Sequence, residues 1–348
     1  MIKNSVRPVV SAVAKQSARD DRIKKTFVTF DPVLSSYCEL GTAFAPSGDF
    51  EIEVIIYVPD SISTSTTYGI VATGSGDNII YARDDTGSAP SVRWQVPRTS
   101  GNSYPAVDIE YNKLTHIKVW RDGDDFYIKN LDSEDTTSVI GATDYDGEPF
   151  NYVGRWNTGD YFDGIISSVK LTDLATPSNS QHYALNRITG NTETSLINSG
   201  LITYNNITDS DREVFSWDAA NDYWVGENEL VNNGGFDTDS DWTKGTGWSI
   251  AGGKAIYDGD IGGVALLYQE VSRPSQYLVD ISLSVMDGNG LQFYDGASYS
   301  TNLTNTGNHK LVETNADTSY GFFTMRASSE DNDIAIDRVS LKRVLQVA

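Results

Sequence analysis

The sequence predicts an all-β protein in which two antiparallel β-sandwich domains follow each other behind a short N-terminal arm. The chain has 348 residues, more than one hydrophobic core usually serves, so two domains are expected. It contains 30 glycines and 19 tyrosines, and stretches of helix-favouring residues are few. Together with runs in which apolar and polar residues alternate, this composition indicates short strands joined by tight turns.

Residues 1–26 form the predicted arm. Pro8 interrupts any early helix, and the segment has too few apolar residues to build a core of its own. Two interpretations are open, a disordered tail or an arm that becomes ordered on a partner, and we favour the arm. The basic side chains that we expect to anchor it are Arg7, Lys15, Arg19, Arg22, Lys24 and Lys25.

Residues 27–175 form the first predicted sandwich. In 50–58 the apolar residues fall on one face and the glutamates on the other, which is the pattern of a half-buried strand. The dipeptide Asp122-Gly123 marks a tight hairpin between two further strands. The other expected strands are 68–73, 78–83, 91–96, 114–121, 125–130 and 164–172.

Residues 176–228 are expected to be a structured connector, in which Trp217 and Trp224 supply packing. Residues 229–348 form the second predicted sandwich. There 277–285 alternates between apolar and polar residues. The remaining strands expected in this part are 320–327 and 334–342.

The charge of the chain is unevenly distributed. The formal net charge is −22, and residues 1–25 contribute +5 from seven basic and two acidic side chains, so the remaining residues carry −27. Such an acidic body repels phosphate backbones, and we expect no nucleic acid among its partners. No apolar run is long enough for a signal peptide or a membrane span, so neither secretion by the general route nor membrane insertion is expected.

Catalysis and disulfide chemistry have little support in the sequence. Cys38 is the single cysteine, which rules out an intrachain disulfide. The histidines, His116, His182 and His309, lie far apart and have no nucleophile signature beside them. We therefore expect a protein that is not an enzyme.

The segments KLTHIKVWRDGDDFYIKN (113–130) and YVGRWNTGDYFDGIISSVKL (152–171) carry a first resemblance. They resemble the laminin G-like, concanavalin A-like jelly rolls, in which an Arg-Asp-Gly turn leads into an aromatic strand. The residues that match the closing Phe-x-Gly-x-Ile pattern are Phe162, Gly164 and Ile166. The resemblance covers about residues 27–175 and implies a lectin-like sandwich.

A second resemblance lies in ELVNNGGFDTDSDWTKGTGW (229–248) and DIAIDRVSLKR (333–343). These segments resemble the opening and closing strands of the galactose-binding-like jelly roll found in carbohydrate-binding modules. Two such sandwiches behind a short basic arm are similar to bacteriophage virion proteins of the head-decoration and tail-fibre kinds. The resemblance implies a place on the virion surface, capsid or tail proteins as partners, and a homo-oligomer.

Aromatic side chains in the predicted loops are candidates for binding sugar. Flat rings stack on the apolar faces of sugars while neighbouring polar groups bond the hydroxyls. The alternative for each ring is a place in the core, where tryptophans usually lie. The candidates are Trp242, Trp248, Tyr294 and Tyr299 in the second sandwich and Trp94, Trp156 and Tyr161 in the first.

Asp237, Asp239 and Asp241 are spaced like the start of a calcium loop. Tryptophan replaces the glycine required at the sixth position and the glutamate required at the twelfth, which excludes an EF-type loop. The stretch therefore predicts a solvated turn after the first strand of the second sandwich.

Asp337 is the stronger metal candidate. Strict alternation places it on the core face with Val339, and a buried carboxylate needs a partner. In the modules that the sequence resembles, a structural calcium is often held near the last strand, which implies Asp337 with Asn233 or Asp258 as ligands. The alternatives are a bulge that turns Asp337 outward and a hydrogen bond to a turn amide.

Two functions follow as expectations. The first is a non-enzymatic surface protein of a phage particle, anchored by its arm and displaying two lectin-like sandwiches as capsid decoration or a head fibre. The alternative is a tail fibre or receptor-binding protein that recognises host cell-surface polysaccharide, and a polysaccharide depolymerase ranks third. An exposed row of aromatic rings favours recognition over decoration.

Overall fold

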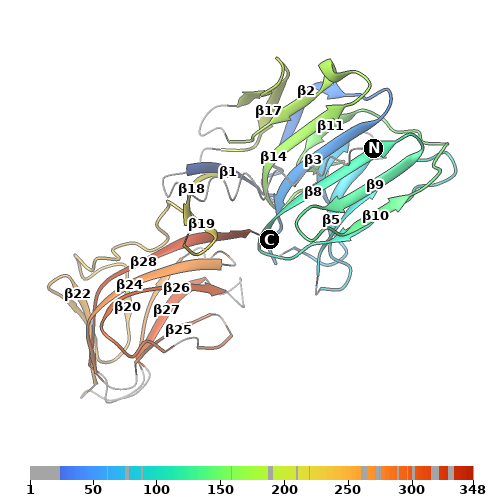
Figure 1. Ribbon diagram of the computed structural model, residues 1–348. Helices are drawn as coiled ribbons and strands as arrows, with labels where there is room; N and C mark the ends of the chain where they lie inside the picture. Colours follow the sequence, from blue (N-terminus) through green and yellow to red (C-terminus); the bar gives the residue numbers. More distant parts are fainter. Residues whose placement is uncertain are drawn as a thin grey trace. The chain divides into compact units, whose positions relative to one another are not determined.

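The computed structural model is all-β, as predicted (Figure 1). It divides into two compact units, of which the first contains the chain up to Trp224 together with the residues from Gln346 on, and the second covers Val225–Leu345. No helix in the described part of the chain has the length and hydrophobicity needed to cross a membrane. The structure describes residues 24–60, 62–74, 78–87, 89–157, 159–186, 191–208, 211–218, 220–259, 265–271, 274, 276–287, 290–295, 297–299, 302–314, 321–327 and 333–347.

Two layers of antiparallel strands build the first unit. In spatial order, one sheet contains β10 (Thr136–Val139), β9 (Asp125–Asn130), β8 (Lys113–Asp122), β3 (Phe50–Tyr57), β14 (Gly164–Asp173), β1 (Lys24–Phe30) and β18 (Arg212–Asp218), and β15 (Gln181–Tyr183) also pairs with β14. The other contains β16 (Thr192–Thr194), β17 (Leu201–Asn205), β2 (Tyr37–Phe44), β11 (Phe150–Val153), β4 (Tyr68–Thr73), β5 (Ile79–Arg83), β6 (Ser91–Gln95) and β7 (Ala106–Asp108). The core lies between the two sheets.

Alternation places the side chains of this unit. Along β3, Phe50, Ile52 and Val54 are 1% exposed or less and face the core, as the sequence predicts. Gly123 adopts a left-handed conformation, with φ of 61°, in the tight turn between β8 and β9. The strands β12 (Arg155–Trp156) and β13 (Asp160–Tyr161) pair only with each other as a short hairpin, and the 3-10 turn η1 (Pro177–Asn179) precedes β15.

The segment between 176 and 224 differs from the connector that we expected. β15 extends one sheet beside β14, β17 pairs with β2 in the other sheet, and β18 pairs with β1. The segment therefore completes both sheets of the first unit. The strands β15 and β16 lie at sheet edges and have three residues each, so their alternation is hard to recognise in the sequence.

The second unit is a smaller sandwich. One sheet contains β21 (Trp248–Ala251), β22 (Lys254–Asp258), β28 (Asp333–Val347), β24 (Gln276–Asp287) and β26 (Gly307–Thr314) in this order. The four-stranded sheet contains β20 (Thr243–Lys244), β23 (Leu266–Glu270), β27 (Phe322–Ala327) and β25 (Leu291–Tyr294). Between them lies the second core. The remaining strand, β19 (Tyr223–Gly226), lies at the boundary of the two units.

A bulge in β28 changes the orientation expected for Asp337. Ser282 pairs with Arg338 and Leu283 pairs with Ile336, so Asp337 is passed over in the ladder. One extra residue in a strand shifts the alternation of everything on one side of it. Ile336 stays in the core, whereas Asp337 turns outward, and the inward orientation expected for Asp337 is wrong.

Candidate functional site

Trp242 and Trp248, two of the predicted sugar platforms, lie in the core of the second unit. Each is 6% exposed. The indole Nε1 of Trp242 donates to the carbonyl of Asn233 at 3.1 Å, and that of Trp248 donates to the carbonyl of Ala265 at 3.1 Å. With both rings buried and both indole N–H groups bonded, these tryptophans stabilise the fold and offer no surface to a ligand.

A different set of rings lies on the face of the four-stranded sheet that points away from the core. In β27, Phe323 and Met325 fill the core, so alternation sends Phe322, Thr324 and Arg326 to the other face. The same logic applies to β23 and β25, whose core residues are Leu267 and Phe293. The half-buried residues of this face, which we call the aromatic face, are Tyr268, Gln292, Tyr294, Tyr299, Phe322 and Arg326.

Cross-strand pairing brings these rings together. Thr324 lies between Tyr268 on one side and Tyr294 on the other. Its own side chain is 1% exposed, which leaves the flanking rings to form the surface. Tyr268 also packs edge-on against Phe322 at 5.6 Å between ring centroids.

A tight turn holds Tyr299 beside Tyr294. The carboxylate of Asp295 accepts hydrogen bonds from the backbone N–H of Ala297 at 2.8 Å and of Ser298 at 2.6 Å. The chain then returns along β25, where Tyr299 bridges to Tyr294 with ring centroids 4.9 Å apart. Both tyrosines predicted to bind sugar therefore share one face.

Arg326 is the cation of the aromatic face. Its guanidinium carbon lies 3.4 Å from the ring centroid of Tyr299, a cation–π contact. Its Nε donates to the amide oxygen Oε1 of Gln292 at 3.2 Å, and an Nη2 hydrogen bond goes to the same oxygen. The ring below and the amide beside it fix the plane of the guanidinium group.

The first unit presents a second outward face, on its eight-stranded sheet. The hairpin β12–β13 lies on this sheet directly over Gly69, where a Cβ atom would come within 2.5 Å of the backbone nitrogen of Trp156. The absence of a side chain at Gly69 therefore permits the close approach. The half-buried ring of Trp156 packs against Ala72, Ile79 and Tyr81.

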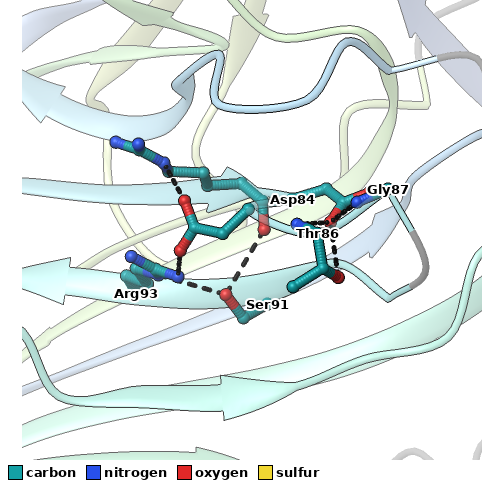
Figure 2. Close-up of polar contacts among 7 residues, drawn as sticks. Asp84, Thr86, Gly87, Ser91 and Arg93 are labelled. Carbon is teal, nitrogen blue, oxygen red and sulfur yellow. Dashed lines mark hydrogen bonds and ion pairs between the residues drawn. The ribbon is translucent and has the colours of Figure 1, made fainter.

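Two arginines lie next to Tyr81 on this face. Arg93 is the cross-strand neighbour of Tyr81, and Asp85 forms ion pairs with Arg93 and, at 2.6 Å, with Arg83. The Nε of Arg93 donates to the hydroxyl of Ser91 at 3.1 Å (Figure 2). Hydrogen bonds from Arg93 and Arg83 hold the pKa of Asp85 below its ordinary value, so one ionised carboxylate serves two guanidinium groups.

The turn that presents this network is held by a buried carboxylate. Asp84 is 1% exposed and accepts hydrogen bonds from the backbone N–H groups of Thr86 and Gly87, each at 2.8 Å (Figure 2). The hydroxyl of Tyr111 donates to its other oxygen at 2.5 Å. Asp84 therefore has a structural role, whereas Asp85 beside it points toward the arginines.

Two other rings are predicted from the sequence to bind sugar in the first unit. Trp94 is 0% exposed and lies in the core, so that prediction is wrong for it, and Tyr161 belongs to a separate cluster. Its ring lies 6.2 Å from that of Tyr37. The guanidinium group of Arg155 lies over two rings, at 4.7 Å from the centroid of Tyr37 and 4.6 Å from that of Tyr152. Trp156 and Tyr161 thus share one hairpin but contact different neighbours.

The opposite sheet of the first unit carries a row of charges on its outward face. The carboxylate of Glu53 contacts the Nε2 of His116 at 3.3 Å and the Nζ of Lys170 at 2.9 Å. The hydrogen bond from His116, followed by that from Lys170, outweighs partial burial and lowers the pKa of Glu53 to about 2. His182 pairs with Lys170 across the strands and contacts the hydroxyl of Ser168 at 3.3 Å, so two histidines that are distant in the sequence lie on one face.

The residues predicted to hold calcium engage separate partners. Asp337 accepts hydrogen bonds from Lys254 and Ser284, each at 2.7 Å. Partial burial acts to raise the pKa of Asp337, and these two partners with the charge of Lys254 bring it below its ordinary value. The amide of Asn233 donates to the carbonyl of Thr238 at 2.7 Å, and Asp258 is exposed at the end of β22. In the described ranges, no group of three or more His, Cys, Asp or Glu side chains is placed to hold a metal ion.

The basic residues predicted to anchor the arm fall into two groups. Arg7, Lys15, Arg19 and Arg22 lie outside the described residues. Lys24 and Lys25 belong to β1, where they pair with Ser216 and Phe215 of β18. The Nζ of Lys25 donates to the hydroxyl of Ser167 at 3.2 Å, and burial lowers the pKa of Lys25 to about 8. These two lysines therefore contribute to a sheet of the first unit.

Sequence reasoning found Tyr294 and Tyr299 but missed the other residues of the aromatic face. The missed residues are Tyr268, Gln292, Phe322 and Arg326. Each alternates with a core residue in a strand of four to six residues, so the orientation of one strand in the core decides the exposure of all of them. Half-buried rings beside a fixed guanidinium and an amide supply a stacking surface with hydrogen-bond donors, the combination that binds a sugar ring.

Known proteins of similar fold are distant. No family model matches this sequence, and no curated protein sequence matches it. A protein of Bacteroides ovatus described as carbohydrate-binding shares 17% identity over 56% of this chain and 60% of its own, with a TM-score of 0.40. The enzymatically active domain of tailspike protein 2 of bacteriophage CBA120 shares 15% identity over 53% and 32%, with a TM-score of 0.33. Domains LG4-5 of the mouse laminin α1 chain share 10% identity over 91% and 80%, with a TM-score of 0.33. The chain spans less than two thirds of the first two proteins, and no functional residue is carried over from any of them.

Proposed function

We propose that this protein is a non-enzymatic glycan-binding protein of a bacteriophage particle, and that the aromatic face of the second unit holds the sugar. The observation that carries the proposal is the row formed by Tyr268, Tyr294 and Tyr299 on one outward sheet face. These tyrosines flank a covered threonine and are half-buried, so part of each residue is exposed to solvent. A pyranose ring can stack there while its hydroxyls reach the phenolic oxygens.

The chemistry of the face favours recognition over decoration alone. A tyrosine that only supports the fold does not need other aromatic rings and an arginine on the same face of the sheet. A ligand-binding surface needs these groups together, because they contact the ligand jointly. The burial of Trp242 and Trp248 removes the loop tryptophans from this role but leaves the row of tyrosines. The resulting proposal is closer to a receptor-binding protein that recognises cell-surface polysaccharide than to a decoration protein without a ligand.

The place of the protein on the particle is the second part of the proposal. It is supported by the basic arm, by the acidic remainder of the chain, and by the resemblance of the tandem sandwiches to phage virion proteins. Capsid or tail proteins would then be its partners, and copies of the chain would form a homo-oligomer on the virion surface. A densely displayed acidic protein repels its neighbours, which keeps such an array open to ligands.

Binding of polysaccharides to the full chain tests the first part. The Tyr268→Ala and Tyr294→Ala variants are expected to weaken binding by up to about tenfold each, because a ring contact contributes about 0.5 to 1.5 kcal/mol. The control is Tyr127→Ala, which removes a ring stacked on Trp120 at 4.7 Å on a sheet of the first unit. Equal losses in all three variants would show that the aromatic face has no special role.

Deletion of the arm tests the second part. Because β1 begins at Lys24, the deletion should remove residues 1–23 and leave the strand intact. We expect the shortened chain to fold and to bind glycan, but no longer to associate with particles from which the protein has been stripped. Association that survives the deletion would assign the attachment to the folded units and contradict the anchoring role of the arm.

A further inference from the structure

The aromatic face contains a cation without a counter-charge. Arg326 is half-buried, yet it makes no ion pair with any described residue. Eleven other arginine and lysine side chains form ion pairs with carboxylates in the described part of the chain: Arg83, Arg93, Arg98, Lys113, Lys118, Lys129, Lys170, Lys244, Lys254, Lys310 and Arg338. Its contacts are the ring of Tyr299 and the amide oxygen of Gln292, both of which are neutral. A partly desolvated charge of this kind is stabilised when an anion binds beside it.

The hydrogen-bonding edge of Arg326 is also incomplete. A guanidinium group carries five N–H donors in a fixed fork. The oxygen of Gln292 takes one from Nε and one from Nη2, which leaves three donors without a described partner, among them a pair on the terminal Nη1/Nη2 edge. Two parallel donors at such an edge match the two oxygens of a carboxylate.

The orientation of this edge is set before a ligand binds. The contact with the Tyr299 ring fixes the plane of the guanidinium, and Gln292 prevents rotation within that plane. Tyr299 is in turn held to Tyr294 by the bridge after the Asp295 turn. A fixed donor pair loses little freedom on binding, so more of the interaction appears as affinity.

We propose that the ligand of the aromatic face is an acidic saccharide, a polymer of uronic acids, whose carboxylate binds the terminal edge of Arg326 while sugar rings stack on the tyrosines. This inference rests on the proposed glycan-binding function and specifies its ligand class. It also explains why a chain with a net charge of −22 keeps an unneutralised arginine at this place. The acidic remainder of the protein disfavours non-specific binding of polyanions, and selectivity then comes from the one matched contact.

The test uses three uronic-acid polysaccharides, polygalacturonate, alginate and hyaluronate, each beside its carboxyl-reduced form. Reduction converts the carboxylate into a neutral hydroxymethyl group and leaves the sugar rings in place. For at least one pair, the full-length protein is expected to bind the acidic form on the order of ten- to a hundredfold more tightly, the range of a bidentate charged hydrogen bond. The preference should shrink as salt is raised.

Two variants locate the preference. Arg326→Gln should lower the affinity for the acidic form to that for the reduced form and leave the reduced form unaffected, and Arg326→Lys should keep only part of the preference because it lacks the fork. Arg338→Gln is the matched control, since Arg338 is exposed on the other sheet of the second unit and pairs with Asp280 at 2.8 Å. Its removal is expected to leave the preference unchanged. If Arg326→Gln does not fold, the lysine variant and the salt dependence decide the question.

The outcomes separate this inference from the proposed function. Equal binding of acidic and reduced forms, lost in Tyr294→Ala, would overturn the acidic ligand and support glycan binding. An acidic preference that persists in Arg326→Gln would also overturn the role of this arginine. Absence of binding to all six preparations would contradict the acidic ligand. The tyrosine variants on a wider set of neutral polysaccharides would then decide the proposed function by itself.

Discussion

Replacing Glu53 by glutamine should destabilise the first unit, because it removes the negative charge that interacts with His116 and Lys170. Glu53 lies on β3 between β8 and β14, and contacts His116 from one strand and Lys170 from the other. The side chain is 19% exposed. In the variant, Lys170 keeps its charge without a carboxylate, and the hydrogen bond of His116 becomes one to a neutral amide.

The magnitude follows from the pKa of Glu53, which falls from an ordinary 4.5 to about 2 in the folded protein. A pKa difference of one corresponds to about 1.4 kcal/mol, so the interactions of the ionised carboxylate contribute roughly 3 kcal/mol, or about 2 kcal/mol after allowance for its partial exposure. Because the folded pKa is the lower one, this contribution is fully present above pH 4.5 and is lost as the pH falls toward 2. Wild type and Glu53→Gln should therefore differ at pH 7 and converge near pH 2.

Urea unfolding followed by pulse proteolysis measures this for each unit, because the fragments show by mass which unit has opened. Glu51→Gln is the control, since Glu51 lies on the same strand and pairs with Lys118 at 2.7 Å. That pair is half-buried and is expected to contribute about 1 kcal/mol or less. The reasoning is refuted if Glu53→Gln lowers the free energy of unfolding by no more than Glu51→Gln does at pH 7. It is also refuted if the loss caused by Glu53→Gln does not change with pH.

Three further predictions concern packing and burial. Gly69→Ala should displace the hairpin β12–β13, because a Cβ atom would lie 2.5 Å from the backbone of Trp156, and faster amide hydrogen exchange in 152–162 checks this. Trp248→Ala should cost the second unit about 3 to 5 kcal/mol in urea unfolding, as expected for removing a buried tryptophan, without a change in the unfolding of the first unit. Lys25→Met should stabilise the first unit at pH 7, because the folded pKa of about 8 lies below the ordinary 10.5 and the buried charge is penalised below pH 8. Wild type should gain stability between pH 8 and 10.5, so the advantage of the variant, measured by urea unfolding, should disappear above pH 10.5.

Long alternating runs made most of the fold predictable. The pattern at 50–58 identifies β3, which buries one face along its length, and the pattern at 277–285 identifies the central part of β24. In β24 the buried face runs from Tyr277 to Leu283, and after a register shift Val285 is 44% exposed. The strands β15 and β16 could not be found in this way, since three residues at a sheet edge give too few alternations. Two pairings between strands that are far apart in the sequence, β17 with β2 and β18 with β1, complete the sheets.

The site was harder to predict because exposure is decided by which way a strand faces. Tryptophans in polar segments are expected to be exposed, yet Trp242 and Trp248 are buried in the core and donate their indole N–H groups to backbone carbonyls. Conversely, Arg326 lies in β27 between the apolar residues Met325 and Ala327, and nothing near it in the sequence indicates a ligand-binding surface. A β-bulge also leaves no signal in the sequence. The outward orientation of Asp337 could therefore be recognised only from the pairing of β24 with β28.

The position of β1 has a mechanical consequence. The strand that follows the arm lies inside its sheet, with antiparallel ladders to β14 on one side and β18 on the other. Tension applied along it at Lys24 would load both ladders in shear, so that several hydrogen bonds must break together instead of opening one after another. If the arm tethers the protein to a particle, the tether continues directly into a strand that is held by two ladders.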